Sequence, residues 1–183
     1  MPSPRTVTPF RHHDSARSIP HHKRHHSSAQ VQTQPCGVDL TLRRVLTWTS
    51  PGTIDFENRH RRTANATEIP FIKEDSEATE HDDSLAVHLS AGAYLVEFNE
   101  TVQVPLDMMG QLFVRSSLFR LEAMVSAGVM DSGYQGAVGA LLQVLNPYGL
   151  ILYRDARLAQ FVFHRMSESV EGYQGVYQGR TTV

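Results

Sequence analysis

Residues 128–146 read GVMDSGYQGAVGALLQVLN, and this stretch carries the clearest structural signal in the chain of 183 residues. An apolar run leads to one carboxylate, Asp131, and a turn containing Gly133, Tyr134 and Gly136 precedes a second apolar run. Glycines in this pattern favour a tight hairpin between two strands. The backbone of such a turn is able to hydrogen-bond a planar ligand. Taken alone, the stretch is also typical of an ordinary β-turn with a solvated Asp131.

The sequence on both sides of this hairpin continues the pattern of short strands and turns. Residues 38–46 (VDLTLRRVL) and 93–99 (AYLVEFN) alternate apolar and polar side chains, as half-buried strands do. Further short apolar runs lie in residues 111–119, 149–153 and 157–164, and no segment keeps a helical period over several turns. Many short strands separated by turns predict an all-β domain of about 150 residues, folded as a jelly-roll or barrel.

The bulk composition limits the classes of partner. The net charge is −2, so the molecule as a whole does not attract nucleic acid or a membrane surface. Any polyanion must be held by a local cluster of arginines and backbone N–H groups. The single cysteine, Cys36, excludes an internal disulfide. No apolar run approaches the roughly 20 residues that span a bilayer, and no hydrophobic signal region begins the chain, so we expect a cytoplasmic protein.

Residues 1–33 differ in character from the rest. They are rich in His, Ser, Arg and Pro and have almost no apolar periodicity. Such a segment cannot bury enough surface to offset its loss of entropy on ordering, so we interpret it as a disordered tail. Residues 34–183 would then form the folded domain. Histidine tracts can bind metals and basic clusters can act as localisation signals, but we interpret the tail as a solvated linker and assign it no metal.

Two further segments carry groups suited to phosphate. Arg115 follows an apolar strand and precedes Ser116 and Ser117, which places a forked donor beside two hydroxyls. Gln160 offers an amide in the segment RDARLAQF (residues 154–161), where a turn enters a strand. In isolation, the first pattern is also typical of a surface arginine beside a serine turn, and the second of an ordinary turn before a buried strand.

The order of these segments resembles the dUTPase/dCTP deaminase superfamily. The matching elements are Asp39 in CGVDL, the RSSL run, the turn with Asp131, and the strand that holds Gln160. The resemblance extends over about residues 34 to 180 and is closest to the archaeal-type dUTPases, which are similar to dCTP deaminases in sequence. It implies a distorted jelly-roll and a homotrimer with active sites between subunits, an arrangement that suits a small protomer.

The resemblance also implies a role for each candidate residue. Asp131 would activate water for attack on the α-phosphate of dUTP, with Mg²⁺ as cofactor. Asp39 would either support the metal through a water molecule or serve as a structural hydrogen-bond partner. A lid of about residues 170–183 would close over the nucleotide. The implied substrate-binding residues are Arg115, Ser116, Ser117 and Gln160 for phosphate, Tyr134 for deoxyribose, and Tyr173 and Gln178 in the lid.

The choice between deaminase and diphosphatase depends on one missing carboxylate. Family deaminases carry a Glu on the strand after the turn, as the proton shuttle at the base. Here that position is Leu141 or Gln143, depending on the alignment, and neither side chain shuttles protons at neutral pH. The residues therefore favour a dUTP diphosphatase. A dCTP deaminase, possibly bifunctional, and a non-catalytic deoxynucleotide-binding trimer remain the alternatives.

Overall fold

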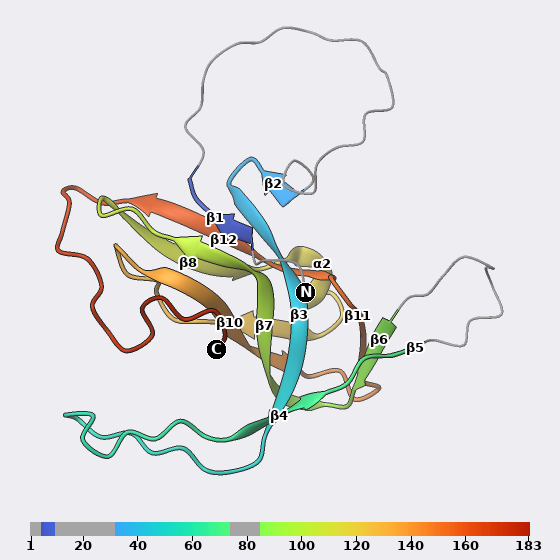
Figure 1. Cartoon of the computed structure of the whole chain (residues 1–183). Coiled ribbons are helices and arrows are strands. Elements are labelled where there is room, and N and C mark those ends of the chain that lie inside the picture. Colours follow the sequence, from blue (N-terminus) through green and yellow to red (C-terminus); the bar gives the residue numbers. More distant parts are fainter. Residues whose placement is uncertain (1–4, 10–31, 74–84) are drawn as a thin grey trace, which may run out of the picture.

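The computed structural model describes residues 5–9, 32–73 and 85–183, and these form strands with one short helix (Figure 1). The helix α2 spans four residues, so no helix in the described part of the chain is long enough to cross a membrane. The elements are β1 (Arg5–Val7), β2 (Thr33–Gln34), β3 (Gly37–Trp48), β4 (Ala66–Ile69), β5 (Ile72–Lys73), β6 (Leu85–Leu89), β7 (Gly92–Gln103), β8 (Met108–Val114), α2 (Ser116–Phe119), β9 (Ala123–Ser126), β10 (Gln135–Val144), β11 (Leu150–Tyr153) and β12 (Arg157–Arg165).

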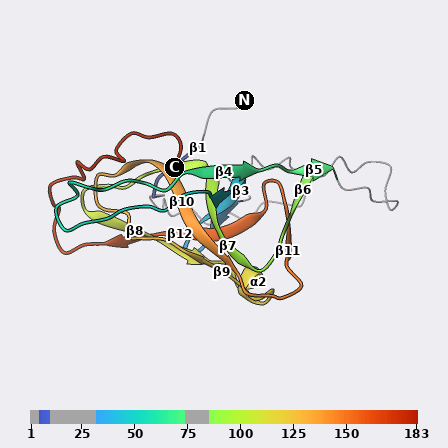
Figure 2. The same cartoon turned by 90° about the horizontal axis from the view of Figure 1, so that it is seen from below.

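The strands form one large curved sheet and one small sheet. The main path of the large sheet runs β8-β12-β3-β7-β10-β9, with β1, β2 and β4 paired to its members, and the small sheet runs β11-β6-β5. The large sheet curls so that its two ends approach, and Gly110 in β8 forms a bridge to Met130, just after β9 (Figure 2). The prediction of an all-β, jelly-roll-like barrel is confirmed, and the barrel is nearly closed.

The alternation read from the sequence places the core inside this barrel. In β10, the side chains of Val138, Ala140, Leu142 and Val144 are buried, and the residues between them face outward. Phe161 of β12 is fully buried on the same core. Burying a side chain of this size stabilises the fold by roughly 1.5–3 kcal/mol, so the core fixes which face each strand presents and, with it, the register.

The N-terminal segment contributes to the sheet at two points. Arg5–Val7 pairs with β7 in parallel, and Thr33–Gln34 pairs with the start of β3. Val7 is buried in the core and anchors the first of these strands. The predicted tail of residues 1–33 therefore includes one strand and the first residue of another, while its residues 1–4 and 10–31 lie outside the described part of the chain.

Two irregularities in the large sheet matter for the site. The pairing of β3 with β7 shifts between Leu42 and Arg44, and the pairing of β10 with β7 shifts between Ala137 and Gly139. A bulge inserts an extra residue into one strand and changes the direction in which its side chain and N–H group point. The bulge in β3 lets the consecutive residues Arg43 and Arg44 both reach one carboxylate on β7.

Candidate functional site

The side chains predicted to bind phosphate gather at one end of β3, β8 and β12. Arg115 follows β8 directly, and Gln160 of β12 lies opposite Asp39 of β3 in the strand register. The Oδ2 atom of Asp39 lies 3.2 Å from Nη1 of Arg115 and 3.3 Å from Nη1 of Arg157. Asp39 is 1% exposed, whereas both arginine side chains reach the surface. The buried carboxylate of Asp39 thus holds two guanidinium groups beside Gln160, where they are able to bind an anion.

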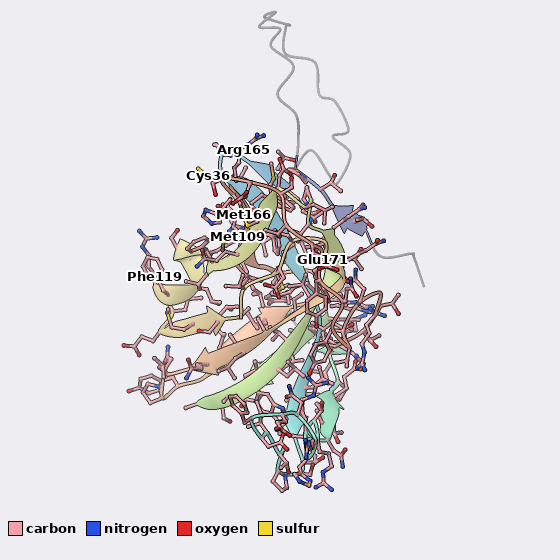
Figure 3. The ribbon with its side chains drawn as sticks, turned by 90° about the vertical axis from the view of Figure 1, so that its left-hand side faces the viewer. Cys36, Met109, Phe119, Arg165, Met166 and Glu171 are labelled. Atoms are coloured by element: carbon pink, nitrogen blue, oxygen red, sulfur yellow. The ribbon has the colours of Figure 1, made fainter. Side chains whose placement is uncertain are left out.

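The helix α2 presents the two predicted serines at the same end of β8. Arg115 is its N-cap residue and has an extended backbone, and Leu118 anchors the turn in the core. Ser116 and Ser117 are exposed, so their hydroxyls remain available to a ligand. Phe119 ends the helix and lies at the outer margin of the molecule (Figure 3).

Asp131 stands on a turn that is tied to the other end of β8. Met130 and Gly110 exchange two backbone hydrogen bonds of 2.9 Å, which fix the residue before Asp131 against the strand. The carbonyl of Asp131 accepts the N–H of Tyr134 at 3.1 Å and closes the turn. The side chain of Asp131 is exposed. A carboxylate in that position is accessible to water and to a ligand approaching from outside.

The turn requires glycine at position 133. Gly133 has a φ of +77°, in the region that side chains with a Cβ rarely adopt. A Cβ there would also lie 2.7 Å from the Cα of Gly172. The N–H of Gly133 donates to Val104 at 2.9 Å, and the N–H of Val104 donates to Tyr134 at 2.9 Å. The turn predicted from the glycine pattern is present, but it is not a tight hairpin, because the pairing of β9 with β10 begins only at Ser126 and Leu141.

Tyr134 is buried directly after this turn. It is 9% exposed, and its hydroxyl donates to the carbonyl of Ala137 at 2.7 Å. The ring of Tyr173 meets it edge to face, with centroids 5.5 Å apart. Burial raises the pKa of the Tyr134 hydroxyl above its ordinary value of 10.0, the neighbouring Tyr173 raises it further, and Arg180 lowers it. The predicted role of Tyr134 against deoxyribose stays a prediction.

Residues 172–183, here called the C-terminal strap, lie across the turn and along β10 (Figure 1). The N–H of Tyr173 donates to the carbonyl of Ser132 at 2.7 Å. The side-chain amide of Gln178 accepts the N–H of Gln135 at 3.0 Å and donates to the carbonyl of Gly133 at 2.9 Å. The two residues predicted to bind substrate from the lid are thus brought together with the turn that carries Asp131.

The candidate residues form two groups at opposite ends of β8. One group surrounds Arg115, which follows the last residue of the strand, and the other surrounds Asp131, which adjoins Gly110 near its start. Arg115 lies five residue steps along the chain from Gly110, which corresponds to about 16 Å in an extended strand. A single chain therefore does not bring the predicted phosphate binders and the predicted base to one point.

Strand β10 is the place where a deaminase would carry the carboxylate that shuttles protons to the nucleobase. Leu141 and Gln143 point to the outer face of the sheet, with no carboxylate among the residues of β10. The neighbouring strand does carry one on that face, because Glu97 of β7 lies opposite Gly139 in the register. Glu97 is fully buried and ion-paired with Arg43 and Arg44, so it is not a free proton shuttle.

Sequence reasoning missed two residues that build the site, Arg157 and Gln34, and the buried carboxylate of Glu97 beside β10. Arg157 and Gln34 contact Asp39, and their place depends on strand register, which the sequence does not reveal. Glu97 did leave a signal, because it is a carboxylate in the middle of an apolar strand run. A charge at a buried strand position is rare without a partner, so it points to a local ion pair.

The carboxylate of Asp39 offers little room for a direct metal bond. Its Oδ2 atom faces two guanidinium groups and accepts the amide of Gln34 at 3.2 Å. This geometry supplies the hydrogen-bond role that the sequence left open. The residues that the structure describes contain no cluster of three or more His, Cys, Asp or Glu side chains placed to hold a metal ion.

Comparison with known proteins identifies the family. A family model described as dCTP deaminase-like matches residues 11–166. The chain is 36% identical over 154 residues to the probable deoxyuridine 5'-triphosphate nucleotidohydrolase of Methanosarcina mazei, covering 84% of each chain. It is also 36% identical over 151 residues to the deoxyuridine 5'-triphosphate nucleotidohydrolase of Methanocaldococcus jannaschii, covering 82% of this chain and 90% of that protein.

A solved structure supports the fold. The crystal structure of 2'-deoxycytidine 5'-triphosphate deaminase from Agrobacterium tumefaciens aligns with a TM-score of 0.50 and 20% identity. The alignment covers 77% of this chain and 41% of that longer chain. The family model matches most of the sequence, and the Methanosarcina mazei relative aligns over 84% of its own length. The chain therefore belongs to the dCTP deaminase-like family.

Proposed function

We propose that this chain is a dUTP diphosphatase that converts dUTP and water to dUMP and diphosphate. One observation carries the proposal: the turn after β9 presents Asp131 to solvent, while β10 holds Leu141 and Gln143 where a deaminase needs a carboxylate. The archaeal relatives named as deoxyuridine 5'-triphosphate nucleotidohydrolases support the same activity.

The chemistry assigns a step to each group of residues. Asp131 takes a proton from water, whose oxygen attacks the α-phosphorus in line. The bond from that phosphorus to the bridging oxygen breaks, and diphosphate leaves. Arg115, with Ser116, Ser117 and Gln160, binds the phosphate chain and stabilises its charge. Asp39 positions Arg115 for this task.

The Oδ2 atom of Asp39 already faces Arg115 and Arg157. Mg²⁺ would therefore be held mainly by substrate phosphate and water and not by a direct bond to Asp39. When bound, the metal would neutralise negative charge on the phosphate chain while diphosphate leaves. Asp39 remains a candidate for a contact through water, but its positioning of the two arginines is the role that we propose.

A homotrimer would unite the two halves of the site. Asp131 and Arg115 lie at opposite ends of β8 in one chain, so a neighbouring subunit has to supply one of them. Large apolar side chains close to Arg115 are exposed, among them Phe113 at 43%, Phe119 at 47% and Leu121 at 49%. Exposed apolar groups in such number are suited to burial against a partner subunit.

The product of the reaction tests the proposal. Purified protein is incubated with Mg²⁺ and dUTP, dCTP, dTTP or UTP, and diphosphate and ammonia are measured. We expect diphosphate from dUTP, little from UTP, and no ammonia from dCTP, with turnover of Asp131→Asn lowered by a factor on the order of 10² to 10⁴. Ammonia from dCTP would establish the deaminase that the family description favours, and nucleotide binding without either product would indicate a regulatory protein.

A further inference from the structure

The N-terminal segment, defined here as residues 5–9 and 32–34, meets the barrel where β3 and β7 diverge. In the register of these two strands, the first pair is Leu42 with Phe98. Strand β7 continues beyond that pair, and from Glu100 onward it pairs with β1. Strand β2 pairs with the start of β3, which here also pairs with β12 (Figure 1). The segment is therefore paired to both of the diverging strands.

Side chains take the place of a backbone ladder at this divergence. Glu100 is 2% exposed, its Oε2 atom accepts the N–H of Thr41 at 2.8 Å, and its Oε1 atom accepts the Thr41 hydroxyl at 2.7 Å. The Oε1 atom also accepts the side-chain amide of Gln32 at 2.6 Å. A buried carboxylate that loses such donors is left with an uncompensated charge, which costs free energy. Gln32 therefore helps to compensate the buried charge of Glu100.

The segment holds Asp39 at two points. Gln32 is 6% exposed, and its Nε2 atom donates to the backbone carbonyl of Asp39 at 3.0 Å. Its Oε1 atom accepts a hydrogen bond from Nη1 of Arg5 at 2.9 Å, which orients the amide. The Nε2 atom of Gln34 donates to Oδ2 of Asp39 at 3.2 Å. One glutamine thus fixes the main chain of Asp39, and the other fixes its carboxylate.

The carboxylate of Asp39 needs such a constraint, because the terminal torsion of an aspartate has broad minima. Its Oδ2 atom lies 3.2 Å from Nη1 of Arg115 and 3.3 Å from Nη1 of Arg157. Rotation of the carboxylate would move this oxygen and, with it, both guanidinium groups. Gln34 donates to the same oxygen and opposes that rotation. The direction of the two arginines therefore depends on a residue of the N-terminal segment.

We propose that Gln32 and Gln34 are positioning residues of the phosphate site and act through Asp39 on Arg115 and Arg157. The N-terminal segment is then part of the machinery that binds the triphosphate, and not only an added edge of the sheet. A displacement of about 1 Å in a group that holds substrate is enough to lower activity strongly. This inference rests on the proposed function, because it takes Arg115 to bind the phosphate chain.

Calorimetric titration with inorganic triphosphate measures this site without turnover. Gln34→Leu and Gln32→Leu remove the amides and keep most of the side-chain volume, and each is expected to weaken triphosphate binding roughly tenfold. Thr6→Val is the matched control, because Thr6 joins the same segment to Thr101 at 3.0 Å in an exposed contact that does not lead to Asp39. The affinity of the control should stay within about twofold of wild type.

Kinetics with dUTP separate positioning from a loss of stability. Urea denaturation identifies a temperature at which the variants are folded, and kcat and KM are measured there. A residue that only stabilises the fold would leave both constants unchanged in folded protein. We expect KM for dUTP to rise roughly tenfold in Gln34→Leu, with a smaller fall in kcat. Gln34 is only partly buried, so this variant carries the test even if Gln32→Leu does not fold.

A double-mutant cycle tests whether Gln34 acts through Asp39. Asp39→Asn keeps the shape of the side chain but removes the charge that attracts the two arginines. If Asp39 transmits the effect, Gln34→Leu should weaken triphosphate binding much less in the Asp39→Asn background than in wild type. Equal weakening in both backgrounds would show that Gln34 acts by another route and would overturn the inference.

The outcomes distinguish this inference from the proposed function. If wild-type protein releases diphosphate from dUTP, but triphosphate affinity and KM are unchanged in Gln34→Leu and Gln32→Leu, the chain remains a diphosphatase and the positioning role is refuted. Wild-type protein that binds triphosphate but releases no diphosphate would refute the proposed function, and weaker binding in the two variants would then still support the inference. Absence of triphosphate binding to the wild-type protein would overturn the inference.

Discussion

The Nη1 atom of Arg115 lies 3.2 Å from the Oδ2 atom of Asp39, although one residue follows β8 and the other belongs to β3. The same oxygen contacts Arg157 on β12 at 3.3 Å. Because β12 lies between β8 and β3 in the sheet, this single carboxylate joins three adjacent strands. The end of the site that we propose to bind phosphate is therefore held by a buried charge and not by loop contacts alone.

Replacing Asp39 by alanine should destabilise the fold. The substitution takes the buried partner from two arginines that themselves reach the surface, and loss of hydrogen bonds to a charged group costs about 1.5–3 kcal/mol. We expect the free energy of unfolding, measured by urea denaturation, to fall by about that amount. Asp107→Ala serves as the control, because the pair between Asp107 and Arg165 is exposed and 3.9 Å long. A loss no larger than that of the control would contradict the structural role of Asp39.

Replacing Asp131 by asparagine should stop the reaction without loosening the protein. The side chain is exposed and the turn is held by backbone hydrogen bonds, so stability should change by less than about 0.5 kcal/mol. Loss of a general base lowers kcat by a factor on the order of 10² to 10⁴. Steady-state diphosphate release gives kcat, and calorimetry with dUMP gives the affinity, which should stay within a few-fold of wild type. Preserved turnover would remove Asp131 from the mechanism.

The sequence predicted the parts of the fold that depend on local pattern. The alternation in residues 38–46 and 93–99 indicated strands, and β3 and β7 contain these residues. The glycine turn around Gly133 was predicted for the same reason, because a positive φ favours glycine whatever the rest of the fold does. The strand Arg5–Val7 was not predicted, since it has a single apolar anchor and pairs with a strand far along the chain.

The relations that depend on register were beyond the sequence. The pairing of Asp39 with Arg115 and Arg157 arises only when β3, β12 and β8 are aligned, and no local pattern encodes that alignment. The separation of Asp131 from Arg115 along β8 is a second example, because the resemblance implied active sites between subunits but not which residues one subunit supplies. The resemblance supplied the roles of these residues, whereas the structure supplied their distances.

The decrease in the free energy of unfolding above pH 10 should depend on Tyr134. Its pKa is raised above 10.0 in the folded protein, so between pH 10 and that higher pKa the unfolded chain releases the proton while the folded chain keeps it. Stability is therefore lost as pH rises through this window, and the effect is absent below pH 10. Tyr134→Phe should lose about 1 kcal/mol at neutral pH through the hydrogen bond to Ala137, and should decline less above pH 10.

Urea denaturation at pH 8, 10 and 11 measures both effects. Tyr148→Phe is the matched control, because Tyr148 is 97% exposed and its ring has no core contact to lose. The control should follow wild type at every pH. If Tyr134→Phe shows the same alkaline decline as wild type, burial of that hydroxyl does not contribute to the pH dependence.

The support that β8 gives to the turn with the proposed base, Asp131, can be tested at Gly110. A Cβ at Gly110 would lie 2.7 Å from Cε1 of the fully buried Phe161 and 3.1 Å from the Cβ of Met130. Overpacking of this kind typically costs 1–3 kcal/mol, and the push on Met130 would also shift Asp131, which follows it. We expect Gly110→Ala to lower the free energy of unfolding by about 2 kcal/mol and to lower kcat in folded protein.

Gly128→Ala, in the loop that leads to Met130, is the control. No atom lies within 4 Å of the added Cβ, so this variant should retain wild-type stability and turnover. Equal kcat in the two variants, at a temperature where both are folded, would show that the bridge between Gly110 and Met130 does not position Asp131.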